Sequence, residues 1–101
     1  MKYLKIGGHD LELHIRNVND ANFIGETNFN IPCITIDSDT SQSYKESSLI
    51  HEALHAMNTT MDGDEIGHIF LDSLAEQIYQ FLSDNDLLNV DRLKELLKQN
   101  D

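Results

Sequence analysis

The middle of the chain contains two histidines four residues apart, in the sequence His51-Glu52-Ala53-Leu54-His55. On a helix, residues with this spacing lie one above the other on the same face, so their imidazoles can bind one Zn²⁺ ion. Glu52 follows His51 directly, where its carboxylate can hold the water that such an ion activates and can take its proton. The H-E-x-x-H spacing therefore predicts His51 and His55 as zinc ligands and Glu52 as the catalytic base.

Chance alone produces this pattern in some chains that have five histidines, and two histidines on a helix surface are the simpler interpretation. Three features favour a metal site. The pattern falls on a predicted helix, apolar residues flank it, and another histidine, His68, follows on the next predicted helix. The remaining histidines, His9 and His14, lie in a predicted turn and on a predicted strand surface, and we assign them no role. Zinc is therefore the expected cofactor.

A catalytic zinc site takes three protein ligands and leaves a fourth position for water. One extension of the pattern places a third histidine at position 61, but this chain has Met61 there. We expect His68 to be the third ligand because it lies in the first turns of the second predicted helix. Asp72, one turn later, can accept the outer N–H of a liganding imidazole. Three acidic side chains are alternatives for the third ligand: Glu65, Asp72 and Glu76.

Apolar residues spaced by three and four predict two helices, over residues 41–58 and 65–84, which a polar loop containing Gly63 separates. A short amphipathic segment predicts a third helix over residues 90–99. On the second helix, one stripe of apolar side chains is expected to face the core. Its members are Ile66, Phe70, Leu74, Ile78, Phe81 and Leu82.

The N-terminal part of the chain, up to Asp37, carries the pattern of β-strands. The expected strands are residues 2–6, 11–15, 23–27 and 31–37. The first two alternate polar and apolar residues on either side of a turn at residues 7–10, which predicts a β-hairpin. Pro32 has no N–H donor for a central strand, so it fits the start of the fourth strand or a sheet edge, and we take this strand as the candidate for the edge.

These elements predict an α+β fold. A small antiparallel β-sheet of three to four N-terminal strands packs against the H-E-x-x-H active-site helix and a second backing helix, and a short C-terminal helix follows. A chain of 101 residues has the size of one domain, and its apolar fraction of 40% can close a modest core. We therefore expect a single domain over residues 1–101.

Acidic residues outnumber Lys and Arg by 18 to 7, which gives a net charge of −11. Nucleic acid and anionic membranes are not expected as direct partners, because proteins bind both through clustered Lys and Arg. The single cysteine, Cys33, cannot form an internal disulfide, and no secretory or membrane-spanning segment is recognisable. We therefore expect a cytoplasmic protein, and these features do not predict its oligomeric state.

The acidic residues are concentrated in one part of the chain. From Glu46 to Asp91 there is no Lys or Arg, and this stretch contains ten acidic residues and every proposed zinc ligand. A solvated acidic surface is the simpler interpretation of such a stretch. A site within it attracts cations, so we expect a peptide or protein substrate that is itself basic.

Several segments of the chain resemble small phage and prophage proteins of the zincin-like metallopeptidase type. They are Gly25-Glu26-Thr27, Ile34-Thr35-Ile36-Asp37, Leu49-Ile50-His51-Glu52-Ala53-Leu54-His55-Ala56-Met57 and Leu74-Ala75-Glu76-Gln77-Ile78-Tyr79-Gln80-Phe81-Leu82-Ser83-Asp84-Asn85. The resemblance extends to about Asp84. It implies a minimal gluzincin-type scaffold with its third ligand on the second helix and, for a phage protein, the host cytoplasm as its location. Such proteins have an acidic residue near the position that His68 occupies here.

The expected function is that of a zinc-dependent metallopeptidase, which hydrolyses peptide bonds through a water that zinc activates. The substrate is expected to lie extended along the strand at residues 34–37. Tyr79 or Tyr44 can assist the oxyanion, although packing is the simpler role for both. The alternative is a non-catalytic acidic interaction module of phage type, in which zinc is structural or absent.

Overall fold

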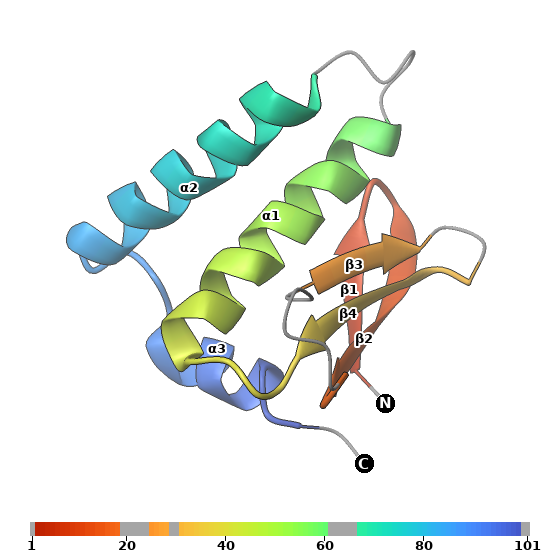
Figure 1. The fold of residues 1–101 in the computed structure, drawn as a ribbon, viewed down its shortest axis with the longest axis horizontal. Coiled ribbons are helices and arrows are strands. Elements are labelled where there is room, and N and C mark those ends of the chain that lie inside the picture. Colours follow the sequence, from red (N-terminus) through yellow and green to blue (C-terminus); the bar gives the residue numbers. More distant parts are fainter. Residues whose placement is uncertain (1, 19–24, 29–30, 61–66, 100–101) are drawn as a thin grey trace.

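The structure is a computed structural model that describes residues 2–18, 25–28, 31–60 and 67–99. In chain order, its elements are β1 (Lys2–Ile6), β2 (His9–Arg16), β3 (Gly25–Asn28), β4 (Cys33–Asp37), α1 (Gln42–Thr60), α2 (His68–Asp84) and α3 (Val90–Leu96). Figure 1 shows α1 lying between the sheet and α2, with α3 near the first turns of α1. The predicted α+β architecture, with one sheet of N-terminal strands and a short C-terminal helix, is confirmed.

β1 and β2 form the predicted antiparallel hairpin, in which Leu4 lies opposite Leu11. Gly7 and Gly8 make the turn, with φ angles of 59° and 81°. Two successive positive φ angles are typical of the type I′ turn, whose twist matches that of the flanking strands, and glycine adopts them at little steric cost. The turn sets the register of the hairpin. This register matters because a shift by one residue would move Leu11 from the core face of the sheet to the opposite face.

β4 lies inside the sheet, between β2 and β3, in the order β1-β2-β4-β3. It pairs antiparallel with β3 and parallel with β2, so the mostly antiparallel sheet is mixed. All five residues of β4 are buried. The prediction that this strand lies at an edge was therefore wrong, and β3 is an edge strand of the described sheet.

Pro32 explains why the edge prediction failed. The residue comes immediately before β4, and its carbonyl accepts a hydrogen bond of 2.9 Å from the Glu12 N–H. A proline at this place removes no donor from the ladder of β4 itself, so it is compatible with a central strand. The proline therefore marks where the strand starts and says nothing about its position in the sheet.

One face of the sheet packs against α1. Its apolar side chains alternate along the strands, as a period of two requires, and are almost fully buried. The core comprises Ile6, Leu11, Leu13, Ile15, Ile34 and Ile36 from the sheet, Leu49 and Ala56 from α1, and Leu96 and Leu97 around the end of α3. Leu49 and Ala56 flank the H-E-x-x-H sequence, so this packing fixes its helix on the sheet.

α2 packs mainly on α1 and buries Leu71 and Ala75. Phe70 and Phe81 are 64% and 61% exposed, so the prediction that they face the core was wrong, while Leu74, Ile78 and Leu82 of the same stripe are half-buried. A helix with one main neighbour buries a narrower face than its whole apolar stripe. The small side chain of Ala75 lies in that face, so α2 is turned by about one residue relative to the prediction.

The helices agree with their predicted ranges to within a few residues. α1 continues to Thr60, α2 begins at His68, and α3 ends at Leu96 instead of at residue 99. The first two residues of the predicted second helix, 65 and 66, lie outside the described residues, as do the first two of the predicted third strand, 23 and 24. Among the described helices, none combines the length and the apolar character that crossing a membrane requires.

Lys2 connects β1 to the end of α3. Its ammonium group donates hydrogen bonds to the backbone carbonyls of Glu95, Leu96 and Lys98, at 3.2, 2.9 and 2.8 Å. The last carbonyls of a helix lack intrahelical donors and carry partial negative charge, so a cation is favourable there. The contact brings the N-terminal strand close to the C-terminal end of the described chain (Figure 1).

Candidate metal centre

The two histidines of the H-E-x-x-H sequence lie one turn apart on α1. Their ring centroids are 4.6 Å apart, with an interplanar angle of 27°, and their Nε2 atoms are 2.8 Å apart. α2 contributes Asp72, whose Oδ1 lies 2.7 Å from Nε2 of His51 and 3.2 Å from Nε2 of His55. One donor atom from each of these three residues therefore converges between α1 and α2.

These three donor atoms fit a metal ion in spacing. They lie within 4.8 Å of one another, and the printed pairs, at 2.7 to 3.2 Å, are closer still. Two ligands of one zinc ion are at most about 4 Å apart, because each Zn–N bond measures about 2.0–2.1 Å. The triad of His51, His55 and Asp72 therefore has the dimensions of a site for one ion.

The chemistry of the donors also favours a cation. Each Nε2 atom carries at most one proton, and an ionised carboxylate carries none, so at most two protons serve the three close contacts of the triad. A cation between the three lone pairs removes this shortage. Imidazole and carboxylate bind zinc, and they bind other divalent transition metals as well. The triad thus fits a divalent metal without identifying it.

His68 lies next to the triad. Its side chain is 72% exposed, and its Nε2 lies 3.2 Å from Oδ2 of Asp72, the second oxygen of that carboxylate. Its ring centroid is 4.7 Å from that of His55 and 6.4 Å from that of His51. In this geometry Asp72 supplies the third donor atom of the site, and His68 contacts the other oxygen of its carboxylate. The sequence predicted the reverse, with His68 as the third ligand and Asp72 as a hydrogen-bond acceptor for a liganding imidazole.

Two other acidic residues were alternatives for the third ligand. Glu65 lies outside the described residues, and Glu76 is an exposed residue one turn beyond Asp72. Among the described residues, the group of donors close enough to share an ion contains Asp72 and not Glu76. Asp72 is therefore the acidic side chain that the described structure brings to His51 and His55.

Glu52 is held by the edge strand β3. Its side chain is buried, and its Oε1 accepts a hydrogen bond of 2.6 Å from the hydroxyl of Thr27. The same hydroxyl lies 3.3 Å from the backbone carbonyl oxygen of Glu52. A carboxylate with one oxygen bonded in this way keeps a fixed orientation, which is what a group for proton transfer requires.

β3 lies close to α1 at Gly25. A Cβ atom at this position would collide with Oγ of Ser48 and would lie 3.2 Å from Cγ of Glu52. Glycine therefore allows the strand to lie against the turn of α1 that carries Glu52. The sequence marked Gly25 and Thr27 only as part of a resemblance, because tertiary packing alone brings Thr27 to a residue 25 positions later.

Two neighbouring hollows lie beside the triad, and His51 lines both. One, of about 400 Å³, is lined by Gly25, Thr27, His51, Glu52, His55, Thr59 and His68. The other, of about 320 Å³, is lined by Gly25, Tyr44, Ser47, Ser48, His51, Glu52 and Glu76. Because they share three residues, we treat them as one feature, the metal cleft, between β3, α1 and α2. Its described lining contains Glu52 and Glu76 but no Lys or Arg.

The two tyrosines considered for the oxyanion take different positions. The hydroxyl of Tyr79 donates a hydrogen bond of 2.8 Å to Oε1 of Glu46, and the Gln42 amide donates one of 3.1 Å to Oε2. Burial, and then the bond to Glu46, raise the pKa of Tyr79 to about 12. Tyr79 thus joins α2 to the first turns of α1, while Tyr44 is largely exposed and lines the metal cleft.

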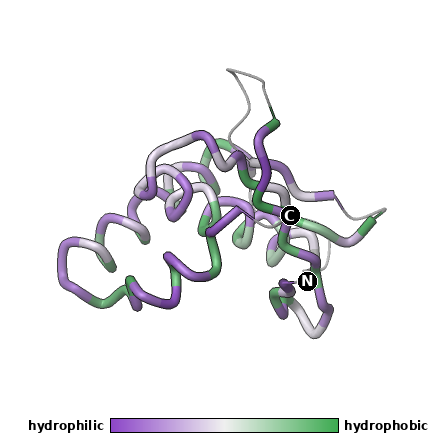
Figure 2. Tube along the Cα trace, turned by 90° about the horizontal axis from the view of Figure 1, so that it is seen from below, coloured by the Kyte–Doolittle hydropathy of each residue, from purple (hydrophilic) through white to green (hydrophobic). Residues whose placement is uncertain are grey.

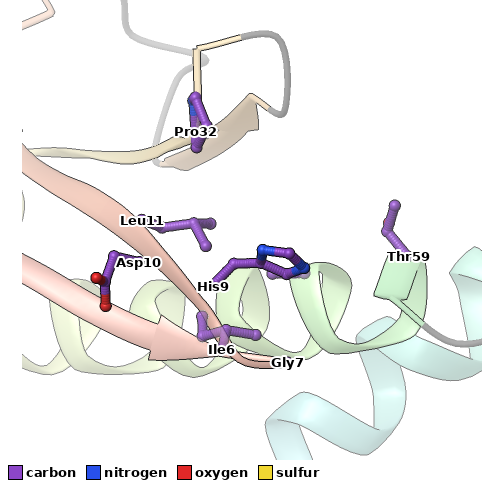
Figure 3. Close-up of a pocket in the computed structure, with 8 residues that line it drawn as sticks. Ile6, Gly7, His9, Asp10, Leu11, Pro32 and Thr59 are labelled. Carbon is purple, nitrogen blue, oxygen red and sulfur yellow. The ribbon is translucent and has the colours of Figure 1, made fainter.

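A larger hollow, of about 540 Å³, lies away from the triad. Figure 3 shows it between the β1–β2 turn, Pro32 and Thr59, with the ring of His9 extending toward Thr59. Its walls include the apolar side chains of Ile6 and Leu11. The potential ligands converge elsewhere, so we place the candidate chemistry in the smaller metal cleft.

Comparisons of this chain with models of protein families, with curated proteins and with solved structures found no match. The fold and the site therefore define the class of protein from its own residues. It is a small α+β protein in which the H-E-x-x-H helix and the helix after it form a candidate metal centre.

Proposed function

We propose that this protein is a zinc-dependent metallopeptidase of the H-E-x-x-H type. The observation that supports it most directly is the convergence of His51, His55 and Asp72 beside the cleft that Glu52 lines. Peptide hydrolysis of this type needs metal ligands, a carboxylate for proton transfer and a surface that aligns the peptide. His51, His55, Glu52 and the edge strand β3 line the metal cleft, which supports the proposal.

In this proposal His51, His55 and Asp72 hold the zinc. Three protein ligands leave one position open in a tetrahedral site, as catalytic zinc sites do. When bound there, zinc supplies a Lewis acid that polarises the scissile carbonyl and lowers the pKa of water. His68 keeps the Asp72 carboxylate in place through its second oxygen.

Glu52 is the proposed general base. Its carboxylate takes the proton from the attacking water and gives it to the leaving amine, so one group acts first as base and then as acid. Thr27 orients this carboxylate through Oε1, and the burial of Glu52 limits competition from bulk water. The residue that transfers the proton is thus positioned by the strand that lies beside the cleft.

The substrate is proposed to lie along β3. An extended peptide can add to a sheet edge through main-chain hydrogen bonds, and β3 is the edge strand next to the metal cleft. β4, where the sequence placed the peptide, has strands on both sides. Glu76 in the cleft favours a basic side chain of the peptide or protein substrate.

A reducing cytoplasm, that of the host for a phage protein, fits the buried free thiol of Cys33.

Peptide hydrolysis by the zinc-loaded protein tests this function. A library of unstructured peptides rich in Lys and Arg is incubated with the protein, and the products are identified by mass spectrometry. We expect cleavage by the wild type and none by Glu52→Gln, which keeps all proposed ligands. Zinc content is measured for both proteins. A zinc-loaded wild type that leaves the library intact contradicts the proposal, and cleavage by Glu52→Gln contradicts the role of Glu52.

The position of His68 favours one alternative. If its imidazole turns from Asp72 to the metal, four protein ligands close the site and the zinc is structural. The protein is then a non-catalytic acidic interaction module. Removal of a structural zinc unfolds such a small protein, whereas removal of a catalytic zinc leaves the helical circular dichroism largely unchanged. Circular dichroism before and after dialysis against a zinc chelator therefore separates the two functions.

A further inference from the structure

α2 turns a row of large apolar side chains toward solvent. Phe70 and Phe81 are 64% and 61% exposed, which is unusual for aromatic residues in a helix of a small protein. Leu74 and Ile78 lie between them and are only half-buried. Because residues three and four apart share a helix face, these four side chains form one line, which we call the α2 row.

Within α2, the positions beside most of the α2 row carry no charge. Beside it lie the neutral residues Ser73, Gln77 and Gln80, while Asp72 belongs to the triad, Glu76 lines the metal cleft, and Asp84 is the last residue of α2. Figure 2 shows apolar positions recurring in the helical part of the chain at the left of the view, which contains α2.

A face without charge matters in a protein with a net charge of −11. Two copies that meet there bring few like charges together, whereas a partner selected by charge gains nothing from such a face. Protein interfaces are also depleted of charged residues and enriched in aromatic ones at their centres. The α2 row therefore favours a second copy of this chain over a basic partner.

The order of the row is the same from either end: aromatic, aliphatic, aliphatic, aromatic. An antiparallel copy of α2 consequently places Phe70 beside the partner's Phe81 and Leu74 beside the partner's Ile78. A two-fold dimer requires that both copies use the same patch in this self-complementary way. Aromatic pairs at both ends of the contact add to the burial of apolar area.

We propose that this protein forms a two-fold symmetric homodimer in which the α2 helices pack antiparallel along the α2 row. α2 has 17 residues and is about 25 Å long, so the buried area lies near the lower end of the range for stable interfaces, roughly 1,200 Å². The dissociation constant is therefore expected on the order of micromolar. Asp72 and Glu76 lie on the other side of α2, so both metal clefts stay open.

Sedimentation equilibrium over a wide concentration range tests the dimer. We expect a monomer–dimer equilibrium for the wild type and a dissociation constant at least tenfold weaker for Phe70→Gln and for Phe81→Gln, because each change removes two rings per dimer. Both side chains are more than half exposed in the monomer, so the variants are expected to fold, which circular dichroism checks. Tyr3→Gln, which removes an aromatic ring that is 54% exposed on β1, is the control and should leave the equilibrium unchanged.

Ionic strength and cross-linking test the chemistry and the geometry of the contact. Added salt should tighten the dimer, because it screens the repulsion between two acidic copies. In a Cys33→Ala background, Gln77→Cys lies near the proposed two-fold axis and should form a dimer with a short thiol cross-linker, whereas Ser43→Cys on α1 should not. A wild type that stays monomeric overturns the proposal. So does a dimer that persists in the Phe70→Gln/Phe81→Gln variant, weakens with salt or fails to link at position 77.

Discussion

Nε2 of His68 lies 3.2 Å from one oxygen of the Asp72 carboxylate, while the other oxygen faces the two histidines of α1. A carboxylate shared in this way can bind a metal through one oxygen and be oriented through the other. Residues that orient a ligand affect metal affinity less than the ligand itself does. The contributions of His68 and Asp72 to metal affinity can therefore be compared by measuring zinc binding in variants of each.

We expect His68→Ala to weaken zinc binding by about 10–100-fold and Asp72→Ala to weaken it further, since only the second change removes a proposed ligand. Competition with a chromophoric zinc chelator measures both constants. His14→Ala, which removes a histidine that bonds to Glu12 on the sheet, is the matched control and should leave affinity unchanged. The opposite order, with His68→Ala the more damaging change, would assign the third ligand to His68 as the sequence suggested.

Thr27 is expected to act on turnover and not on metal binding. Thr27→Val keeps the shape of the side chain but removes the hydrogen bond to Glu52, so we expect peptide hydrolysis to fall by about tenfold with unchanged zinc affinity. Thr27→Ser retains the hydroxyl and should restore most of the activity. Equal losses of kcat in the two variants would show that the hydroxyl does not position Glu52.

Gly25→Ala should displace β3 from α1. The added methyl group would collide with Oγ of Ser48, and we expect a loss of about 1–3 kcal/mol in the free energy of unfolding, measured with urea. Adding Ser48→Ala removes the colliding oxygen and should recover part of the loss. Gly67→Ser is the control, because a Cβ there meets no atom within 4 Å and serine is favourable at the N-cap of α2. If Gly25→Ala is as stable as the wild type, the strand does not need this close approach.

Zinc is expected to stabilise the folded chain. A ligand that binds only the folded state raises the free energy of unfolding by about 2.7 kcal/mol when its free concentration is 100 times its Kd. Thermal unfolding with and without a chelator should therefore show a higher Tm in zinc. The Tm shift should disappear in His55→Ala, which lacks one of the three proposed ligands. A zinc-dependent Tm that survives in His55→Ala would place the metal elsewhere.

Tyr79 should make stability depend on alkaline pH. Its pKa is raised to about 12 in the folded state, by burial and then by the bond to Glu46, against about 10 in the unfolded chain. The folded state binds the phenolic proton up to a higher pH than the unfolded chain does. The contribution of Tyr79 to the free energy of unfolding is therefore complete below pH 10 and is lost as the pH rises from 10 to 12. Tyr79→Phe should lack it, which urea unfolding at several pH values measures. Glu46→Gln should move the phenolate absorbance transition of Tyr79 to lower pH, because it removes the Glu46 carboxylate that helps to raise the pKa.

Features that depend on contacts within a few residues could be predicted from the sequence. A turn at residues 7–10 between two alternating segments predicted the hairpin, and Gly7 and Gly8 make that turn with two positive φ angles. The spacing of His51 and His55 placed their rings together, because residues four apart share a face of any helix. The α+β architecture followed from the same local periodicities.

Features that depend on how the elements pack were decided by the tertiary structure alone. Asp72 is 17 residues from His55, and Thr27 is 25 from Glu52, so no local pattern joins either pair. Periodicity showed that α2 is amphipathic, but the rotation that buries Ala75 and exposes Phe70 depends on the fit to α1. Likewise Pro32 marked a strand end, whereas the place of β4 inside the sheet came from its pairing with both β2 and β3. The amino-acid sequence by itself determined which residues can do the chemistry, and the packing of distant elements decided which of them meet.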